Sequence, residues 1–293
     1  MIEYHPQTNP SKTPIFSIII PTWNNLDYLK NCIKAIFKNS TLDLQIVLHI
    51  NEGKDGTIEW AKENGIDFTL SKENVGVCLA CNSAFHLTKA DYIVFLNDDM
   101  YVLPDWDINL LKGIQEIGHT DFYASSTLIE PYETNNHCVL APYNFGETLQ
   151  EFKEEALVKV AKSLIKEDWN GSTWPPSVLH RSTWHKIGGY SIEFFPGYYS
   201  DPDISAKLWN IGIREFKGIG NSLVYHFMSK STTRFKKKTG YNTFVRKWGM
   251  TARFFTQNFL KISTPYQGRL PEFTNQKVLQ KEQFRSKLKT LLK

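Results

Sequence analysis

The sequence of 293 residues is poor in cysteine and contains no long hydrophobic run. Four cysteines in a chain of this length do not form a disulfide scaffold, which fits a reducing cytosol. No stretch of about 18 apolar residues occurs, so the sequence predicts no membrane-spanning helix. The first residues are polar and include proline, unlike a secretory signal, and we expect residues 1–13 to form a loose arm. Together these absences favour a cytoplasmic protein.

The chain also lacks repeats, low-complexity tracts and any linker rich in proline, glycine and serine. Hydrophobic residues make up 41% and charged residues 22%, which is typical of a globular protein. The basic charge is concentrated in residues 230–253 and 277–293. Such blocks suit a phosphate-bearing ligand, an anionic membrane surface or nucleic acid, or they simply keep the protein soluble. No nucleic-acid-binding module accompanies them.

The first hundred residues alternate between strand and helix patterns. Apolar, β-branched runs predict strands, and apolar residues at helical spacing predict helices between them. The predicted strands cover residues 15–20, 44–50, 66–70 and 91–96, and the predicted helices cover residues 24–39, 56–64 and 76–87. This alternation is typical of an α/β fold with a mainly parallel sheet. Ligands of such sheets bind beyond the carboxyl ends of the strands, where residues 21–24, 51–53 and 97–99 lie.

The regular alternation fades after residue 100. The pattern there predicts a charged helix over 147–168, an aromatic loop over 169–201, a helix over 204–211, a strand over 222–227, and helices over 241–260 and 272–293. Cys78 and Cys81 fall on the predicted helix 76–87, where two small residues can pack on one side. A single C-x-x-C lacks the second pair of a structural zinc site, so redox or metal chemistry is the lesser alternative.

Three polar segments carry the candidate chemistry. Asp98 and Asp99 are adjacent carboxylates at a strand end, a pattern that suits a divalent cation, or else a turn. Asp201, followed by Pro202, is typical of a helix N-cap, and a helix N-terminus would also keep it ionised as a general base. His226 ends a predicted strand and precedes hydroxyl and basic side chains, so it either completes a metal site or packs as a structural histidine.

These segments, in their order along the chain, resemble the family 2 glycosyltransferases, which have the GT-A nucleotide-sugar fold. The motifs that carry the resemblance are Ile18-Ile19-Ile20-Pro21-Thr22-Trp23-Asn24, Asp55-Gly56-Thr57, Asn74-x-Gly76 with Ala80 and Asn82, Asn97-Asp98-Asp99 in the D-x-D position, Gly188-Gly189-Tyr190, Asp201-Pro202-Asp203-Ile204, and His226 with the basic segment behind it. They span roughly residues 14–238. The chain departs from the family at Asn51-Glu52, where many members have two aspartates, and at Ser200, where glutamate is common.

The resemblance implies an inverting, metal-dependent transfer of a sugar from a nucleoside-diphosphate sugar, with a UDP-sugar favoured, to a hydroxyl of a glycan or lipid-linked acceptor. Asp201 is the implied general base, and Asp99 and His226 are the implied ligands of Mn²⁺ or Mg²⁺. The implied contacts to the donor are Pro21, Thr22, Asn24, Asn51, Glu52, Asn74, Asp98 and Arg234. Since aromatic faces pack well on sugar rings, the acceptor candidates are Trp174, Tyr198 and Tyr199, together with Asp203.

These expectations divide the chain into an arm over 1–13, a GT-A domain over 14–240 and a basic helical extension over 241–293. Within the domain, the nucleotide-binding half covers about 14–100 and the acceptor half about 101–240. Residues 277–293 either contact an anionic membrane peripherally, at its inner face, or form a solvated helix packed on the domain or a loose tail.

Two other functions stay open from the sequence. A nucleotidyltransferase of the same fold is disfavoured, because the turn after the first strand contains no glycine, lysine or arginine. A non-catalytic protein that binds nucleotide sugars or carbohydrates is the second alternative.

Overall fold

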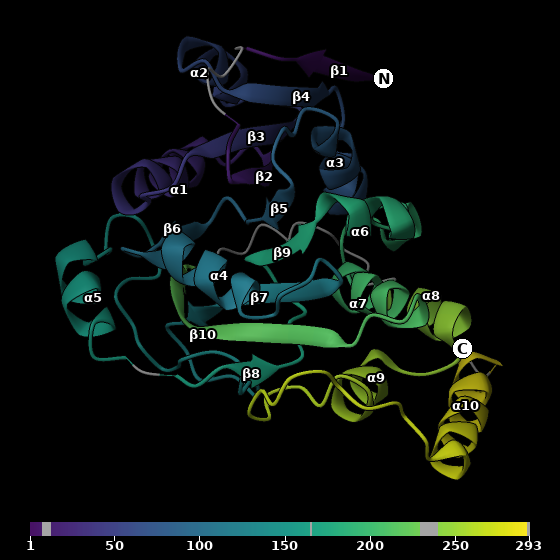
Figure 1. Cartoon of the computed structure of the whole chain (residues 1–293). Helices are drawn as coiled ribbons and strands as arrows, with labels where there is room; N and C mark the ends of the chain where they lie inside the picture. The colour runs from purple at the N-terminus through teal and green to yellow at the C-terminus, as the bar shows by residue number, and fades with distance from the viewer. Residues whose placement is uncertain (8–12, 165, 229–239, 292–293) are drawn as a thin grey trace.

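A mixed β-sheet forms the centre of the computed structural model, which describes residues 1–7, 13–164, 166–228 and 240–291 (Figure 1). Its strands are β1 (Ile2–His5), β2 (Phe16–Trp23), β3 (Leu44–Asn51), β4 (Asp67–Ser71), β5 (Tyr92–Phe95), β6 (Met100–Val102), β7 (Phe122–Ile129), β8 (Trp169–Asn170), β9 (Ser177–His180) and β10 (Glu215–His226). The strands follow the order β1-β4-β3-β2-β5-β9-β7-β10-β6, and β8 pairs with β10. Neighbours from β4 to β5 are parallel, whereas β9 runs antiparallel to β5 and to β7. The predicted parallel arrangement is confirmed for β2, β3, β4 and β5, and β9 joins these strands to the second half.

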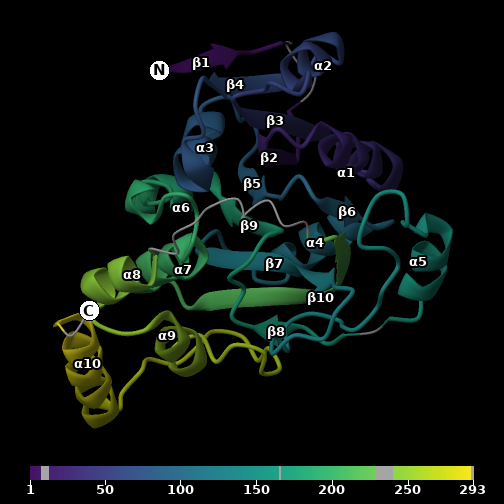
Figure 2. The same ribbon diagram turned by 180° about the vertical axis from the view of Figure 1, so that it is seen from behind.

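Helices cover both faces of the sheet, as Figures 1 and 2 show from opposite sides. The helices are α1 (Leu26–Asn39), α2 (Thr57–Glu63), α3 (Gly76–Phe85), α4 (Trp106–Gln115), α5 (Glu154–Ala161), α6 (Arg181–Ile187), the 3₁₀ turn η1 (Ile192–Phe194), α7 (Ser200–Asn210), α8 (Gly240–Trp248), α9 (Ala252–Asn258) and α10 (Gln276–Leu291). One hydrophobic core packs α1, α2, α4 and α5 against the sheet, and a second core packs α3, α6, α7, α8 and α9. Each core buries apolar surface that drives folding.

Two expectations for the N-terminal region are wrong. Ile2–His5 do not belong to a loose arm, because they form β1, which pairs antiparallel with β4, and the ring of His5 stacks on Phe68 at 4.5 Å. The first predicted strand does not stop at Pro21 but continues to Trp23. Pairing with β5 ends at Ile19, so Pro21 has a partner strand on one side only, where its missing N–H is tolerated.

The second half of the chain differs more from the predicted pattern. The predicted helix over 147–168 is confined to α5, and the aromatic stretch 169–201 contains β8, β9 and α6. The strand β7 was not predicted, because its centre consists of small and hydroxyl-bearing residues. These side chains are nevertheless buried and bonded to β10: Ser126 Oγ lies 2.8 Å from Ser222 Oγ, and Thr127 Oγ1 donates to the carbonyl of Ile219.

The C-terminal helices share the second core rather than standing apart. Phe244 of α8 and Phe255 of α9 are fully buried, and α8 contacts both α7 and α10. The domain boundaries at residues 13, 100 and 240 stay predictions. Within the described ranges, no helix combines the length and hydrophobicity needed to cross a bilayer.

Candidate active site

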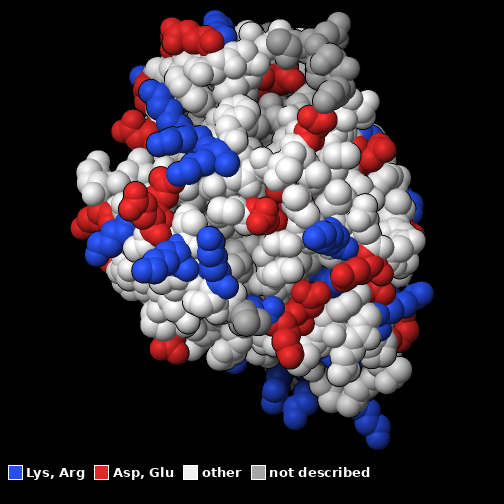
Figure 3. Space-filling model, turned by 60° about the vertical axis from the view of Figure 1, so that its left-hand side comes forward, with Lys and Arg blue, Asp and Glu red and all other residues white. Residues whose placement is uncertain are grey.

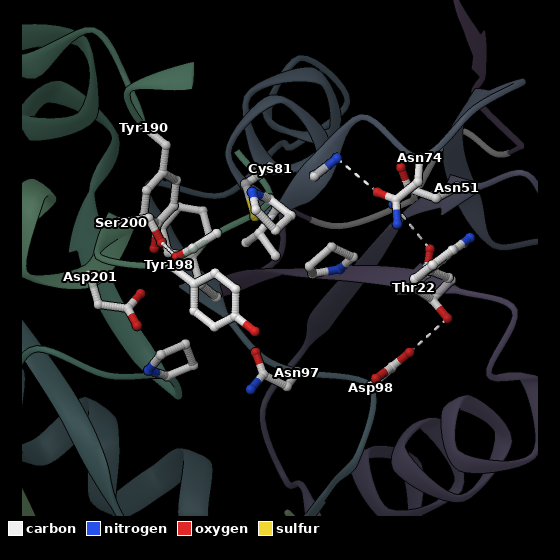
Figure 4. Close-up of a pocket in the computed structure, with 18 of the residues that line it drawn as sticks. Thr22, Asn51, Asn74, Cys81, Asn97, Asp98, Tyr190, Tyr198, Ser200 and Asp201 are labelled. Atoms are coloured by element: carbon white, nitrogen blue, oxygen red, sulfur yellow. Dashed lines mark hydrogen bonds between the residues drawn. The ribbon is translucent and has the colours of Figure 1, made fainter. Parts of the chain in front are cut away.

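A pocket of about 330 Å³ opens between the two halves of the sheet (Figure 4). One wall comes from strand ends of the first half, and the opposite wall comes from the segment that leads into α7. The predicted site residues that line it are Pro21, Thr22, Asn51, Asn74, Asp98, Tyr198, Tyr199 and Asp201. The pocket therefore unites residues that are up to 180 positions apart in the sequence.

Hydrogen bonds between strand ends organise the first wall. Thr22 Oγ1 donates to Asp98 Oδ2 at 2.7 Å, which joins the end of β2 to the turn after β5. Asn51 donates to the carbonyl of Thr22 and accepts from the N–H of Val75, while Asn74 accepts from the N–H of Gly76. The side chain of Asn51 therefore holds the end of β2 and the loop before α3 together, and Asp98 is kept in place as an acceptor that lines the pocket.

Asn24 and Glu52 form a separate polar contact in the loops beside this wall. Both take a positive φ, and Asn24 Nδ2 donates to Glu52 Oε2 at 3.3 Å. The Lys54 ammonium bonds to the Glu52 carboxylate and lowers its pKa. The backbone N–H of Lys54 donates to Asn24 Oδ1. Neither Asn24 nor Glu52 lines the pocket.

Helix α3 connects the two walls. Asn82 bonds to both backbone groups of Tyr190 at 2.8 Å, which fixes the glycine turn before the second wall. A Cβ on Gly189 would lie 2.7 Å from Asn82 Oδ1, and one on Gly76 would lie 2.7 Å from Phe195, so both positions require glycine. Cys81 lines the pocket, and burial raises the pKa of Cys78 to about 12.

The predicted packing role of the two cysteines is confirmed. Cys78 and Cys81 are both buried and free on α3. The raised pKa keeps the Cys78 thiol protonated and unreactive at neutral pH.

Among the described residues, no cluster of three or more cysteine, histidine or acidic side chains could hold a metal ion.

Asp201 carries the titratable group on the second wall, and Figure 4 shows its carboxylate across the pocket from Asp98. The predicted N-cap role is wrong, because α7 already begins at Ser200. Tyr199, with φ 71°, occupies the cap position, and Ser200 Oγ donates to the carbonyl of Gly197. Burial raises the pKa of Asp201 from 3.8 to about 7, against the direction expected from a helix N-terminus. The carboxyl therefore exchanges its proton near neutral pH.

Of the four acceptor candidates, two line the pocket and two do not. Tyr198 and Tyr199 line the pocket, and Tyr198 extends toward Asn97 in Figure 4. Trp174 does not line it, although the neighbouring Pro175 does. Asp203 is fully buried and bonded to Trp248 Nε1 at 2.8 Å and Lys247 Nζ at 3.0 Å, so its carboxylate anchors α8 to α7.

The two predicted metal ligands come together beside Asp98. His226 at the end of β10 pairs with Met100 of β6, and the N–H of Phe227 donates to the carbonyl of Asp99. Asp99 Oδ2 thereby lies 3.5 Å from His226 Nε2. At this separation the two side chains would together be able to hold one divalent cation. A carboxylate and an imidazole suit Mn²⁺, and a site with so few protein ligands keeps positions for phosphate oxygens.

Glu130 was missed by the sequence reasoning and contacts the same histidine. Its Oε1 lies 3.2 Å from His226 Nδ1. Burial alone would lower the pKa of His226, but Asp99 and Glu130 together raise it to about 10. Glu130 directly follows β7, so recognising that strand would have drawn attention to it. Arg234 and the basic residues beside it lie outside the described part of the chain.

The comparisons with known proteins identify the family. The model of glycosyl transferase family 2 matches residues 17–162, about half of the chain. The chain belongs to this family. Two similar proteins come from Pasteurella multocida: a hyaluronan synthase, 26% identical over 250 residues that cover 82% of this chain, and a chondroitin synthase, 27% identical over 157 residues that cover 50% of it. The aligned parts span only 22% and 15% of those proteins.

Solved structures confirm the fold of this family 2 member. Staphylococcus aureus TarS 1–349 matches with a TM-score of 0.53 and 13% identity, covering 72% of this chain and 60% of that one. GalNAc-T7 with UDP, GalNAc and Mn²⁺ matches with a TM-score of 0.59 and 16% identity, covering 94% of this chain and 55% of that one. The predicted α/β class with the GT-A arrangement is therefore confirmed.

Proposed function

We propose that this chain is an inverting glycosyltransferase that moves a sugar from a nucleoside-diphosphate sugar, a UDP-sugar by preference, to a hydroxyl of a glycan or lipid-linked acceptor. The observation that carries the proposal is the pocket in which Thr22, Asp98 and Asn74 face Asp201. The family membership supports it, and so do the names of the similar synthases. The UDP and Mn²⁺ in the GalNAc-T7 structure support the donor class. Residues 14–240 are the proposed catalytic domain, and residues 241–293 the proposed extension.

Asp201 is the proposed general base. Its carboxylate accepts the proton of the acceptor hydroxyl, and the hydroxyl oxygen forms a bond to the anomeric carbon. The bond from that carbon to the diphosphate breaks on the opposite face, and its electron pair leaves with the nucleoside diphosphate, so the configuration inverts. A pKa near 7 suits this role, because the carboxylate is available at neutral pH and still basic enough to accept a proton.

Asp99 and His226 are the proposed holders of Mn²⁺ or Mg²⁺, based on the 3.5 Å between Oδ2 and Nε2. Such a cation, when bound, stabilises the negative charge that develops on the leaving diphosphate. Thr22 orients Asp98 toward the donor, and Arg234 is proposed to contact the diphosphate. Asn24, Asn51, Glu52, Pro21 and Asn74 are proposed to shape the base and ribose site, with Asn51 acting through the loop that it holds.

Tyr198 and Tyr199 are the proposed acceptor platform. Both line the pocket on the side of Asp201, and an aromatic face packs against the apolar face of a sugar ring. Trp174 is retained only as a neighbour of the pocket-lining Pro175. Asp203 is left out of the acceptor site, since its buried contacts to Lys247 and Trp248 occupy the carboxylate.

Peripheral contact with the inner face of a membrane through residues 277–293 is part of the proposal. Helix α10 packs through Leu279, Glu282 and Ser286, with Glu282 bonded to Thr251. At 100° per residue, Lys277, Lys281, Phe284 and Leu288 fall on the opposite side, with Phe284 65% exposed. This side combines apolar and basic groups without an acid. Acidic and basic side chains mingle over much of the face in Figure 3, while basic ones project from its lower end.

Vesicle binding tests this contact. The full chain should bind vesicles that contain phosphatidylglycerol better than vesicles of phosphatidylcholine alone. The pair Lys277→Ser and Lys281→Ser should weaken binding roughly 30-fold, since each lysine contributes about 1 kcal/mol at an anionic surface. The pair Lys30→Ser and Lys34→Ser on α1 is the matched control, because both lysines are exposed on a different helix. Equal binding to both vesicle types, or an equal loss in the control, would reject the contact.

Thermal unfolding with UDP, GDP, dTDP and CDP, each with and without Mn²⁺, tests the central proposal. A nucleotide at about 100 times its dissociation constant adds roughly 2.7 kcal/mol to the free energy of unfolding. We expect a metal-dependent rise in Tm with UDP. A rise with UDP but no transfer to any acceptor would favour the non-catalytic binding protein, and no rise with any nucleotide would contradict the donor assignment.

A further inference from the structure

The imidazole of His226 lies between two carboxylates, Asp99 and Glu130, which adjoin the ends of the two strands flanking β10. On one side, His226 pairs with Met100 of β6, which follows Asp99. On the other side, Tyr225 pairs with Ile129 of β7, so the next residues along these parallel strands are His226 and Glu130. The order β7-β10-β6 therefore sets Asp99 and Glu130 on opposite sides of one ring.

The distances match two different roles for these carboxylates. Glu130 Oε1 lies 3.2 Å from Nδ1, and Asp99 Oδ2 lies 3.5 Å from Nε2. Glu130 therefore contacts the ring nitrogen that faces away from Asp99. A cation held between Asp99 and Nε2 leaves Nδ1 as the protonated nitrogen, whose N–H needs an acceptor.

The backbone of Glu130 is fixed on both sides. Its N–H donates to the carbonyl of Leu140, and its carbonyl accepts from the N–H of Tyr143, both at 2.9 Å. The side chain is buried as well. An acceptor that is fixed in this way holds the ring in one orientation, which a mobile surface carboxylate would not do.

We propose that Glu130 is a positioning residue of the metal site: it accepts a hydrogen bond from Nδ1–H of His226 and thereby directs the Nε2 lone pair toward the cation beside Asp99. This inference rests on the proposed metal-dependent transfer. It adds a residue that belongs to none of the sequence motifs. Glu130 touches neither the donor nor the cation in this role, and it acts only through His226.

Mn²⁺ affinity of the full chain, measured with Mn²⁺ alone by the loss of the free-ion paramagnetic resonance signal, tests the inference. Glu130→Ala should weaken Mn²⁺ binding about 10- to 100-fold, the usual effect of removing a partner behind a ligating histidine. Glu130→Gln should stay near the native affinity, because its amide oxygen still accepts from Nδ1–H. Glu130→Asp should be weak, because its shorter side chain withdraws from the ring. Glu133→Ala, exposed three residues along the chain, is the matched control.

The variants separate the possible results. Native affinity in the folded Glu130→Ala variant would overturn the inference and reduce Glu130 to a structural residue. Native Mn²⁺ affinity in Glu130→Asp together with weakened affinity in Glu130→Gln would also overturn the inference. The negative charge of residue 130, and not its hydrogen bond to His226, would then determine Mn²⁺ binding. If Glu130→Ala does not fold, the Gln and Asp pair still decides. If the native protein binds no Mn²⁺, the metal part of the proposed function is contradicted. If the native protein binds Mn²⁺ and Glu130→Ala binds it equally well, only the role of Glu130 is contradicted.

Discussion

Replacing the proposed base should remove activity and at the same time stabilise the protein. In Asp201→Asn the side chain keeps its shape but cannot accept the proton of the acceptor hydroxyl. Loss of general-base catalysis lowers kcat by roughly 10²- to 10⁴-fold. The stability effect has the opposite sign, because the native fold holds a carboxylate whose ionised form is disfavoured by burial.

The magnitude of the gain follows from the pKa of Asp201. The pKa of Asp201 is about 7 in the folded protein, against an ordinary value of 3.8 for an aspartate, which is a rise of about three. At about 1.36 kcal/mol per unit, the upper bound is about 4 kcal/mol. Since Asp201 lines an open pocket and is partly exposed, water reduces this penalty, and we expect about 1–2 kcal/mol. For a chain of 293 residues the gain corresponds to a rise of roughly 2–3 °C in Tm.

The sign of the stability change follows from how the free energy of unfolding depends on pH. As pH rises from about 4 to 7, the unfolded chain loses the Asp201 proton before the folded chain does, so native stability falls across this window. The gain in Asp201→Asn should therefore be full at pH 8, smaller at pH 5 and absent below pH 4. Calorimetry at these pH values, with exposed Asp43→Asn as control, measures it. A gain that is equal at pH 5 and pH 8, or near-native turnover in Asp201→Asn, would refute the reasoning.

Three further predictions concern the pocket. For the native enzyme, kcat/KM should rise about tenfold per pH unit below pH 7 and level off above it, because the base must be ionised in the free enzyme; a flat profile from pH 5 to 8 would contradict this. Thr22→Val should weaken UDP binding in calorimetric titration by roughly 5- to 30-fold, because Asp98 loses its 2.7 Å donor, and it should lower the free energy of unfolding by about 1–3 kcal/mol, because both partners are buried. Gly76→Ala should lower the free energy of unfolding by about 2–4 kcal/mol, since its Cβ would meet Phe195 at 2.7 Å and φ is +74°. Gly65 also has a positive φ, +62°, but no atom lies within 4 Å of where its Cβ would be. Gly65→Ala should therefore lower the free energy of unfolding only by the cost of backbone strain. An equal loss of stability at both positions would show that the contact with Phe195 does not matter.

The sequence predicted the part of the site that depends on local patterns. The strands before residues 21–24, 51–53 and 97–99 are apolar and periodic, so the edge of the sheet at which Thr22, Asn51 and Asp98 meet could be predicted. Periodicity cannot reveal a strand such as β7, whose buried hydroxyl groups are satisfied only by β10. Without a prediction of β7 and its pairing with β10, no sequence pattern places Glu130 beside His226.

The electrostatic state of Asp201 was also beyond a sequence argument. A position near a helix start predicts a lowered carboxyl pKa, but the packed segment around the pocket determines the opposite direction. That segment is held by Asn82, which bonds to Tyr190 from 108 positions away. Contacts of this separation depend on the whole fold and not on the residues around Asp201.

The proposed base and the proposed ligand pair are held by different parts of the fold, so they should respond separately to mutation. Asp201 depends on α7 and on the turn that Asn82 fixes, whereas His226 and Asp99 depend on the register of β10 with its neighbours. Sites without shared partners usually contribute additively to stability. Asp201→Asn should accordingly leave Mn²⁺ affinity unchanged, and Glu130→Ala should leave the pH at which kcat/KM levels off unchanged. If either variant alters the other property, the base and the cation share a network, and the separation drawn from these contacts fails.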